Sequence, residues 1–201
     1  MIEVEIRVYV TDEQARALIA GAQFESQKSL VTEIYDTADF KLTTKNFWLR
    51  RRNGAFELKY PAMQGANLQL DQNIPVYEIT DELEIRRILQ LQTKGTLQEA
   101  LSEAGVVVLY RFTNTRQTYT KDGFTIDFDH ADFGDLTYNI CEIEKLVALV
   151  DQTKQALDSL YAFAKRYGIS TERAEGKLEH YIRIKNPAHY YAIANSLKNK
   201  A

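Results

Sequence analysis

Hydrophobic and polar residues alternate along the first expected strand, Ile2 to Val10, which has the sequence IEVEIRVYV. Successive side chains of an extended chain point to opposite faces, so one face is apolar and the other carries Glu3, Glu5 and Arg7. Alternation of this kind is typical of a half-buried strand whose charged face meets solvent. Later strands repeat this alternation, and their acidic and basic residues are segregated. The charged faces could therefore line the interior of a barrel instead of meeting solvent.

The same alternation, interrupted by turn signals, predicts seven more strands. They span residues 30–35, 46–52, 55–60, 75–79, 106–119, 124–129 and 138–149. Asn53-Gly54 and Asp122-Gly123 favour tight hairpins, so the strands that flank them are expected to pair antiparallel. A polar loop is expected over residues 61–74.

Helices are expected where apolar residues recur three and four positions apart. The ranges are 11–22, 80–91, 96–105, 151–167, 176–185 and a last helix that starts at Asn186-Pro187. Thr11 with Gln14, and Thr96 with Glu99, have the spacing of capping boxes, and Thr80 is the expected cap of its helix. Hairpin strands with helices as insertions and as a tail favour an α+β fold with an antiparallel sheet. About eight strands suffice to close a barrel that holds side chains or one small ligand.

Composition narrows the class of protein. With 201 residues and 45% hydrophobic content, one domain over residues 1–201 is expected, with barrel strands in 1–149 and helices in 151–198. The net charge of −3 argues against a nucleic-acid partner. A single cysteine, Cys141, excludes an internal disulfide and fits a reducing compartment. No segment resembles a membrane span or a leader, so we expect a cytoplasmic monomer without a membrane partner.

Charged residues on the strand faces fall into an acidic and a basic set. The acidic set is Glu3, Glu5, Asp127, Glu142 and Glu144, and the basic set is Arg7, Arg50, Arg52, Lys59, Arg116 and Lys177. Inside a barrel, such opposed walls would be very unfavourable if they were dry and empty. They suit a wet interior that holds a polyanion, because carboxylates bind Mg²⁺ or Mn²⁺ and arginines grip phosphate oxygens. The alternative is that all of them are solvated outward residues.

Several motifs, in order along the chain, resemble the CYTH family of triphosphate tunnel metalloenzymes, and the thiamine triphosphatase branch in particular. EVEIR at residues 3–7 is similar to the ExExK signature, with Arg7 in place of the lysine. Further similar stretches are YDTADFKL (35–42), WLRRR (48–52), ELKYP (57–61), IDFDHADFGD (126–135), the pair Glu142 and Glu144, and Lys177. The resemblance implies an eight-stranded antiparallel closed barrel that forms a tunnel, with helices around it.

The resemblance also implies roles for individual residues. Glu3, Glu5, Asp127, Glu142 and Glu144 would be metal ligands, with Mg²⁺ or else Mn²⁺ as the ion. Arg7, Arg50, Arg52, Lys59, Arg116 and Lys177 would contact a triphosphate, with Glu3 and Lys59 as the catalytic pair. Glu78 is a further tunnel carboxylate. Trp48 is either a stacking partner for a cationic thiazolium ring or an ordinary core aromatic.

By this resemblance, the expected activity is metal-dependent hydrolysis of thiamine triphosphate, a small-molecule substrate, to thiamine diphosphate and phosphate. Two alternatives stay open: an inorganic tripolyphosphatase of the same fold, and a non-catalytic module that binds phosphorylated metabolites. An adenylate cyclase is less favoured by the branch-specific motifs. Besides Arg7, Ile34 departs from the pattern, since mammalian thiamine triphosphatases have a tyrosine there.

Overall fold

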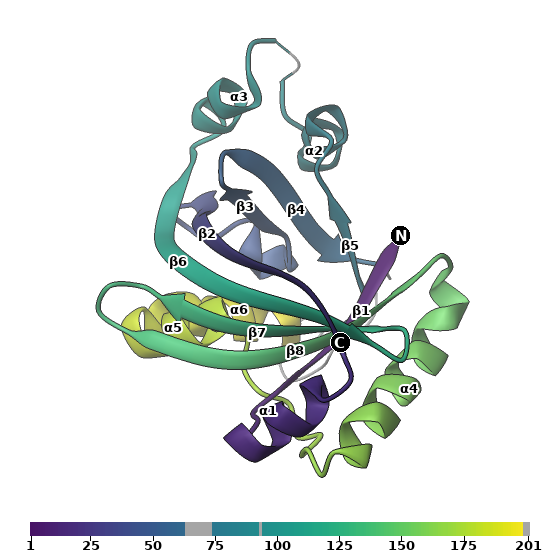
Figure 1. Ribbon diagram of the computed structural model, residues 1–201. Coiled ribbons are helices and arrows are strands. Elements are labelled where there is room, and N and C mark those ends of the chain that lie inside the picture. The colour runs from purple at the N-terminus through teal and green to yellow at the C-terminus, as the bar shows by residue number, and fades with distance from the viewer. Residues whose placement is uncertain (63–73, 93, 199–201) are drawn as a thin grey trace.

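In the computed structural model, which describes residues 1–62, 74–92 and 94–198, eight strands close into an antiparallel barrel (Figure 1). The strand order around the barrel is β1-β5-β4-β3-β2-β6-β7-β8. This confirms the predicted α+β fold and the closed eight-stranded barrel. The polar loop predicted for residues 61–74 lies almost wholly outside the described residues.

The barrel strands follow one another along the chain with helices inserted between them. The strands are β1 (Ile2–Val8), β2 (Gln23–Thr37), β3 (Trp48–Arg52), β4 (Ala55–Pro61), β5 (Val76–Ile79), β6 (Val106–Lys121), β7 (Phe124–Asp132) and β8 (Thr137–Val147). The helices are α1 (Asp12–Ile19), α2 (Glu82–Leu89), α3 (Leu97–Glu103), α4 (Thr153–Arg166), α5 (Lys177–Lys185) and α6 (Pro187–Lys198). Two short 3-10 turns, η1 (Thr43–Lys45) and η2 (Val150–Gln152), complete them.

The apolar face of β1 packs outward against a helix. Val4 and Ile6 are buried in one cluster with Leu160 and Phe163 of α4 and with residues of β7 and β8. A side chain of this size is stabilised by about 2 kcal/mol when it is fully buried. The charged face of β1 is thereby left to point into the barrel.

A second apolar cluster covers the opposite part of the barrel. Leu49 and Leu58 of the β3–β4 hairpin pack against Ile85 of α2 and Leu101 of α3. These two helices form a lobe that stands away from α1 and α4 (top of Figure 1). The barrel strands therefore carry helices on their outer faces in two places.

Strand β2 is much longer than expected. The prediction of residues 30–35 was wrong in extent, because the strand starts at Gln23 and ends at Thr37. Its first half, QFESQKS, lacks apolar alternation, since those side chains are mostly exposed. Backbone pairing with β6 forms this half instead, with Gln23 opposite Thr120 and Lys28 opposite Arg116. Pairing of this kind leaves little trace in the hydrophobic pattern.

The predicted helix starts are largely confirmed. The capping boxes of Thr11 with Gln14 and of Thr96 with Glu99 are both present. The cap of α2 is a correction, because Asp81 rather than Thr80 accepts the hydrogen bond from the Glu84 amide. An aspartate one residue later competes successfully for the same role.

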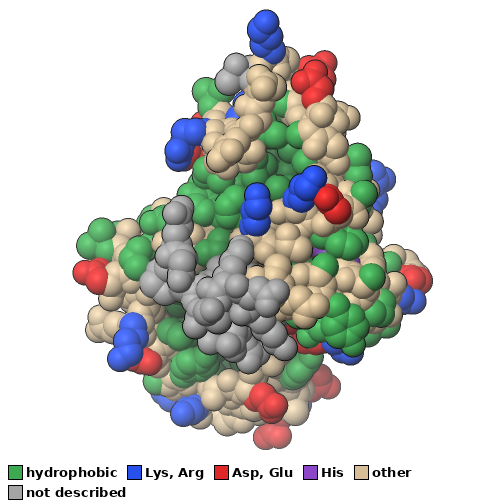
Figure 2. All heavy atoms as spheres, turned by 180° about the vertical axis from the view of Figure 1, so that it is seen from behind, with side chains coloured by type: hydrophobic (Ala, Val, Ile, Leu, Met, Phe, Trp, Pro, Cys, Tyr) green, Lys and Arg blue, Asp and Glu red, His purple; other side chains and the backbone are tan. Residues whose placement is uncertain are grey.

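Among the described residues, no helix combines the length and the apolar content that crossing a membrane requires. On the face seen in Figure 2, Lys and Arg side chains lie singly or in small groups between acidic and hydrophobic ones. The described residues of this face therefore form no continuous basic surface.

Candidate active site

A cavity of about 280 Å³ is lined by inward-facing side chains of the barrel strands and by the start of α5. All the sequence-predicted residues but Asp127 line it, namely Glu3, Glu5, Arg7, Trp48, Arg50, Arg52, Lys59, Glu78, Arg116, Glu142, Glu144 and Lys177. The alternative in which these residues all point to solvent does not hold for this set. The two departures from the family pattern, Arg7 and Ile34, face the same cavity.

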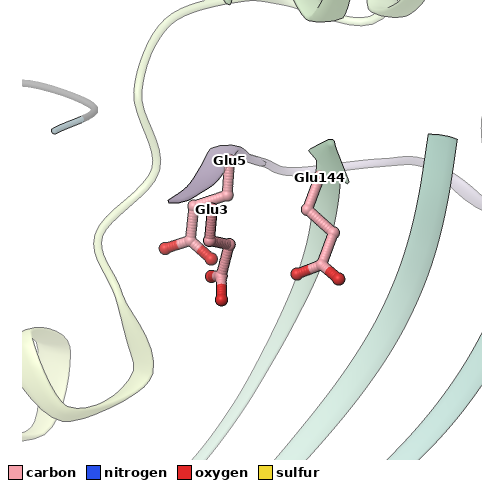
Figure 3. A group of neighbouring side chains, drawn as sticks. All are labelled: Glu3, Glu5 and Glu144. Atoms are coloured by element: carbon pink, nitrogen blue, oxygen red, sulfur yellow. The ribbon is translucent and has the colours of Figure 1, made fainter. Parts of the chain in front are cut away.

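Three carboxyl groups gather on neighbouring strands. Glu3 and Glu5 of β1 and Glu144 of β8 each have a carboxylate oxygen within 4.8 Å of the others. Their side chains extend to the same side of the two strands (Figure 3). Glu5 is the register partner of Glu144 in the antiparallel ladder. The pairing of β1 with β8 is therefore what brings the cluster together.

The carboxylates of this cluster have strongly shifted pKa values. Burial, and then the charge of neighbouring carboxylates, raises the pKa of Glu144 to about 7. Burial raises the pKa of Glu3 to about 8 although Lys59 opposes the shift. Burial also disfavours the charged form of Glu5, but Arg7 and Lys59 outweigh it and hold the pKa of Glu5 at about 2.

The raised pKa values of Glu3 and Glu144 indicate that this part of the cluster is short of positive charge. Lys59 Nζ lies 2.6 Å from Glu3 Oε1 and 4.0 Å from Glu5 Oε2. Arg7 also pairs with Glu5, but these two cationic groups leave the three carboxylates incompletely neutralised. Hard divalent cations such as Mg²⁺ and Mn²⁺ prefer oxygen ligands, so the donor set of Glu3, Glu5 and Glu144 fits such an ion.

The other two predicted metal ligands have basic partners instead. Glu142 accepts hydrogen bonds from Lys177 at 2.6 Å and from Arg116 at 2.7 Å. Its pKa lies well below the usual range because these cations and Arg7 outweigh the effect of burial. Asp127 is buried and accepts from Thr118 at 2.6 Å, and it lies 2.5 Å from the Arg116 guanidinium.

Asp129, which the sequence analysis did not single out, binds the cations of this wall. Its carboxylate accepts from Arg116 Nε and Nη2 at 2.7 and 2.6 Å and from Lys177 Nζ at 2.6 Å. It lies two positions after Asp127 on β7, so strand alternation does place it on the inward face. Arg116 and Lys177 are thereby held side by side, although they come from β6 and α5.

A second group of cations lies on the β3–β4 hairpin. Arg50 donates to Glu57 at 2.6 Å and to Glu78 at 3.0 Å, and Lys59 lies 3.1 Å from Glu78. Arg52 is less fully paired, with Glu57 at 3.4 Å. Burial, and then the nearby Arg50, lowers the pKa of Arg52. A lowered pKa in a guanidinium means that an added anion would be favourable there.

Four buried polar atoms have no hydrogen-bond partner among the described residues, and all belong to cavity-lining side chains. Three are guanidinium donors, the Nε atoms of Arg7, Arg52 and Arg173. The fourth is the amide oxygen of Asn114. Unpartnered guanidinium donors are the complement of phosphate oxygens. Arg173 lies in the irregular segment before α5, where no sequence pattern could indicate it.

One part of the cavity is apolar. Trp48 packs against a cluster that includes Ile34, Phe112 and Leu178, and all four side chains line the cavity. Its indole Nε1 donates to Asn46 Oδ1 at 2.6 Å, which fixes the orientation of the ring. Trp48 therefore contacts the core and the cavity at once, and the two interpretations of it are compatible.

Comparison with known proteins supports these observations. The family model of the CYTH domain matches residues 1–177. The thiamine-triphosphatase of Homo sapiens is 26% identical over 200 residues, which cover 91% of this chain and 84% of that protein. The thiamine-triphosphatase of Macaca fascicularis is 25% identical, with 94% and 87% covered.

Solved structures match the fold at lower identity. A protein from Pyrococcus horikoshii superposes with a TM-score of 0.63 at 19% identity, covering 91% of this chain and 99% of that one. A Hippeastrum protein, described as a proposed adenylyl cyclase with a dominant triphosphatase activity, has a TM-score of 0.54 at 18% identity, with 91% and 95% covered. At these identities the likeness concerns the fold alone.

Proposed function

This chain belongs to the CYTH family, and on that premise we propose that it is a metal-dependent triphosphatase that hydrolyses thiamine triphosphate to thiamine diphosphate and phosphate. One observation carries the proposal: a cluster of three carboxylates and unpartnered guanidinium donors line the same cavity. A polyanion that arrives with a divalent cation satisfies both. The similarity to two thiamine-triphosphatases supports the organic substrate.

Glu3, Glu5 and Glu144 are the residues that would hold Mg²⁺ or Mn²⁺. When bound there, the ion neutralises phosphate oxygens and makes a nearby water more acidic. Glu142 and Asp127 are both ion-paired with Arg116. In this proposal they orient that cation toward the phosphate chain.

The basic residues hold the phosphate chain in a fixed register. Arg50 and Arg52 come from one wall, and Arg116 and Lys177 come from another. Because Glu57 and Asp129 already orient Arg50 and Arg116, few side-chain rotamers are lost when the substrate binds. The triphosphate is thereby oriented for in-line attack on its terminal phosphorus.

The reaction needs a base and a stabilised leaving group. A water oxygen forms the new bond to phosphorus, and the anhydride bond breaks with its electron pair on the diphosphate. Glu3 accepts the proton of the water, and Lys59, 2.6 Å from Glu3, neutralises charge on the departing oxygen. Glu3 comes from β1 and Lys59 from β4, two strands that β5 separates in the barrel.

The runner-up is hydrolysis of inorganic tripolyphosphate. It is favoured by one observation, which is that Arg50, Arg52, Arg116 and Lys177 line the cavity. Contacts of such cations with phosphate oxygens require no organic group. The apolar wall of Trp48, Ile34 and Phe112 supports the organic substrate instead. A non-catalytic binding module has little use for the carboxylate cluster.

Phosphate release in Mg²⁺ from thiamine triphosphate, tripolyphosphate and ATP at matched concentrations tests the proposal. We expect kcat/KM to favour thiamine triphosphate by about 100-fold, or about 2.7 kcal/mol of transition-state discrimination. Trp48→Ala should reduce that preference, whereas Tyr191→Ala, at an exposed position, should leave it unchanged. A preference for tripolyphosphate would select the runner-up, and binding without phosphate release would contradict both.

A further inference from the structure

Asn114 is unlike the other residues whose buried atoms have no partner. The three arginines in that group offer hydrogen-bond donors, but Asn114 offers an acceptor, its Oδ1. The residue is only 3% exposed, and its side chain lines the cavity. A buried acceptor that is left unpaired destabilises a protein by about 1 to 3 kcal/mol. An ionised phosphate oxygen, itself an acceptor, cannot pair with it.

The orientation of the Asn114 amide is determined by its neighbour. The amide Nδ2 donates to Asp129 Oδ1 at 2.7 Å. The Asp129 carboxylate also accepts hydrogen bonds from Arg116 and Lys177, so both of its oxygens act as acceptors. Turning the amide over would place two acceptor oxygens against each other. The nitrogen therefore faces Asp129, and the oxygen is the atom left for the cavity.

Asn114 lies between the charged and the apolar parts of the cavity. Phe112, Asn114 and Arg116 are alternate residues of β6 and share its inward face. Residues two apart on a strand are separated by about 7 Å. On one side, Arg116 belongs to the phosphate contacts. On the other, Phe112 packs with Ile34 and Trp48. Asn114 thus lies between a cation of the proposed phosphate site and the apolar wall that would face an organic group.

We infer that Asn114 is a specificity-determining residue whose Oδ1 accepts a hydrogen bond from an N–H or O–H group on the organic portion of the substrate. The inference rests on the proposed function and deepens it, since it names how organic triphosphates are distinguished from inorganic ones. Tripolyphosphate that is fully ionised has no donor to offer. Thiamine triphosphate has one in the amino group of its pyrimidine ring.

The test compares binding of thiamine triphosphate and tripolyphosphate by titration calorimetry in metal-free buffer, where turnover is not needed. The variants are Asn114→Leu, which removes the acceptor, and Asn114→Thr, which keeps a smaller one. Gln117→Leu is the matched control, because Gln117 is an exposed amide of the same strand. Thermal unfolding verifies that each variant is folded.

The preference is the dissociation constant of tripolyphosphate divided by that of thiamine triphosphate. We expect this ratio to fall about tenfold in Asn114→Leu, which is the effect of one lost hydrogen bond. Asn114→Thr should restore part of the preference, and Gln117→Leu should retain all of it. Equal weakening for both ligands would mean that Asn114 merely supports Asp129, and would overturn the inference. So would an unchanged ratio, or a wild-type protein that binds neither ligand.

Phosphate release by the same wild-type preparation in Mg²⁺ separates the two proposals. If the ratio shifts as expected but no phosphate is released, the proposed function fails and the role of Asn114 in binding stands. If phosphate is released and the ratio does not shift, the activity stands and the role of Asn114 fails.

Discussion

The carboxyl groups of the cavity divide, residue by residue, according to what they are bonded to. Glu142, Asp127 and Asp129 share Arg116, and Lys177 also binds Glu142 and Asp129. In the cluster of Glu3, Glu5 and Glu144, the pKa values of Glu3 and Glu144 are raised, whereas Arg7 and Lys59 lower that of Glu5. The five carboxylates that the family resemblance assigns to metal therefore have different electrostatic surroundings.

Replacing Glu144 by Gln should raise the Mg²⁺ concentration needed for half-maximal phosphate release by at least about tenfold, because one charged oxygen ligand is lost. Glu142→Gln should instead act mainly on the KM for the triphosphate, since it frees Arg116 and Lys177 from a shared partner. Titration of activity against Mg²⁺ for both variants is the measurement. Glu103→Gln, at an exposed position of α3, is the control. Equal Mg²⁺ dependence in the wild type and Glu144→Gln would refute the assignment.

The attachment of α6 illustrates how an element is held by a polar network. His189 of this helix is fully buried, and Tyr110 and Phe40 stack on its ring. Thr43 donates its hydroxyl proton to Asp36 at 2.6 Å. The hydroxyl oxygen of Thr43, 2.7 Å from His189 Nε2, is then free to accept that N–H. Nδ1 is 2.7 Å from Tyr110 Oη and accepts from it. The network therefore requires a neutral imidazole.

Burial lowers the pKa of His189 to about 4, although Asp36 opposes the shift. An unfolded histidine binds its proton near pH 6.5, so the stability that the neutral ring contributes is complete above that pH and is lost as the pH falls toward 4. We expect His189 to account for a loss of about 2 to 3 kcal/mol in unfolding free energy between pH 7.5 and pH 4.5.

Urea unfolding at these two pH values checks the His189 prediction. The variant His189→Gln should be less stable than the wild type at pH 7.5, and most of the difference should disappear at pH 4.5. His130→Gln, at an exposed site of β7, should show no such convergence. Parallel pH dependence in the wild type and His189→Gln would contradict the buried neutral imidazole.

The molecule as a whole is a barrel with charged side chains inside and apolar side chains outside. Helices cover the outer faces of β1 and of the β3–β4 hairpin, and the interior surface carries carboxylates and cations of opposite sign. A formal net charge of −3 conceals this separation of charge. Ion pairs balance much of this charge, but burial keeps the pKa values of Glu3 and Glu144 raised and that of Arg52 lowered. A bound cation or polyanion should therefore stabilise the folded state.

Mg²⁺ should raise the thermal stability of the whole protein, because it binds the folded carboxylate cluster and not the separated residues of the unfolded chain. At 100 times its dissociation constant, an ion of this kind contributes about 2.7 kcal/mol. For a chain of this length we expect Tm to rise by about 5 to 10 °C. Differential scanning calorimetry against NaCl of equal ionic strength is the measurement. Equal Tm values in the two salts would count against the metal site.

Local patterns in the sequence determined the elements and the faces of the strands. Alternation assigned Glu3, Glu5 and Arg7 to one face, and capping residues located the starts of most helices, because both depend on residues a few positions apart. The resemblance to the CYTH family added closure of the barrel and the inward direction of the charged faces. Only the tertiary structure decided how those charges are partnered.

The partners of a side chain depend on strand register and on residues far away in the chain, which local patterns do not contain. The long pairing of β2 with β6 and the shared use of Asp129 by Arg116 and Lys177 both depend on such distant residues. Asn114 shows the same principle most clearly. Alternation on β6 indicates that it faces inward with Arg116, but only the position of Asp129 on β7 determines which end of its amide faces the cavity.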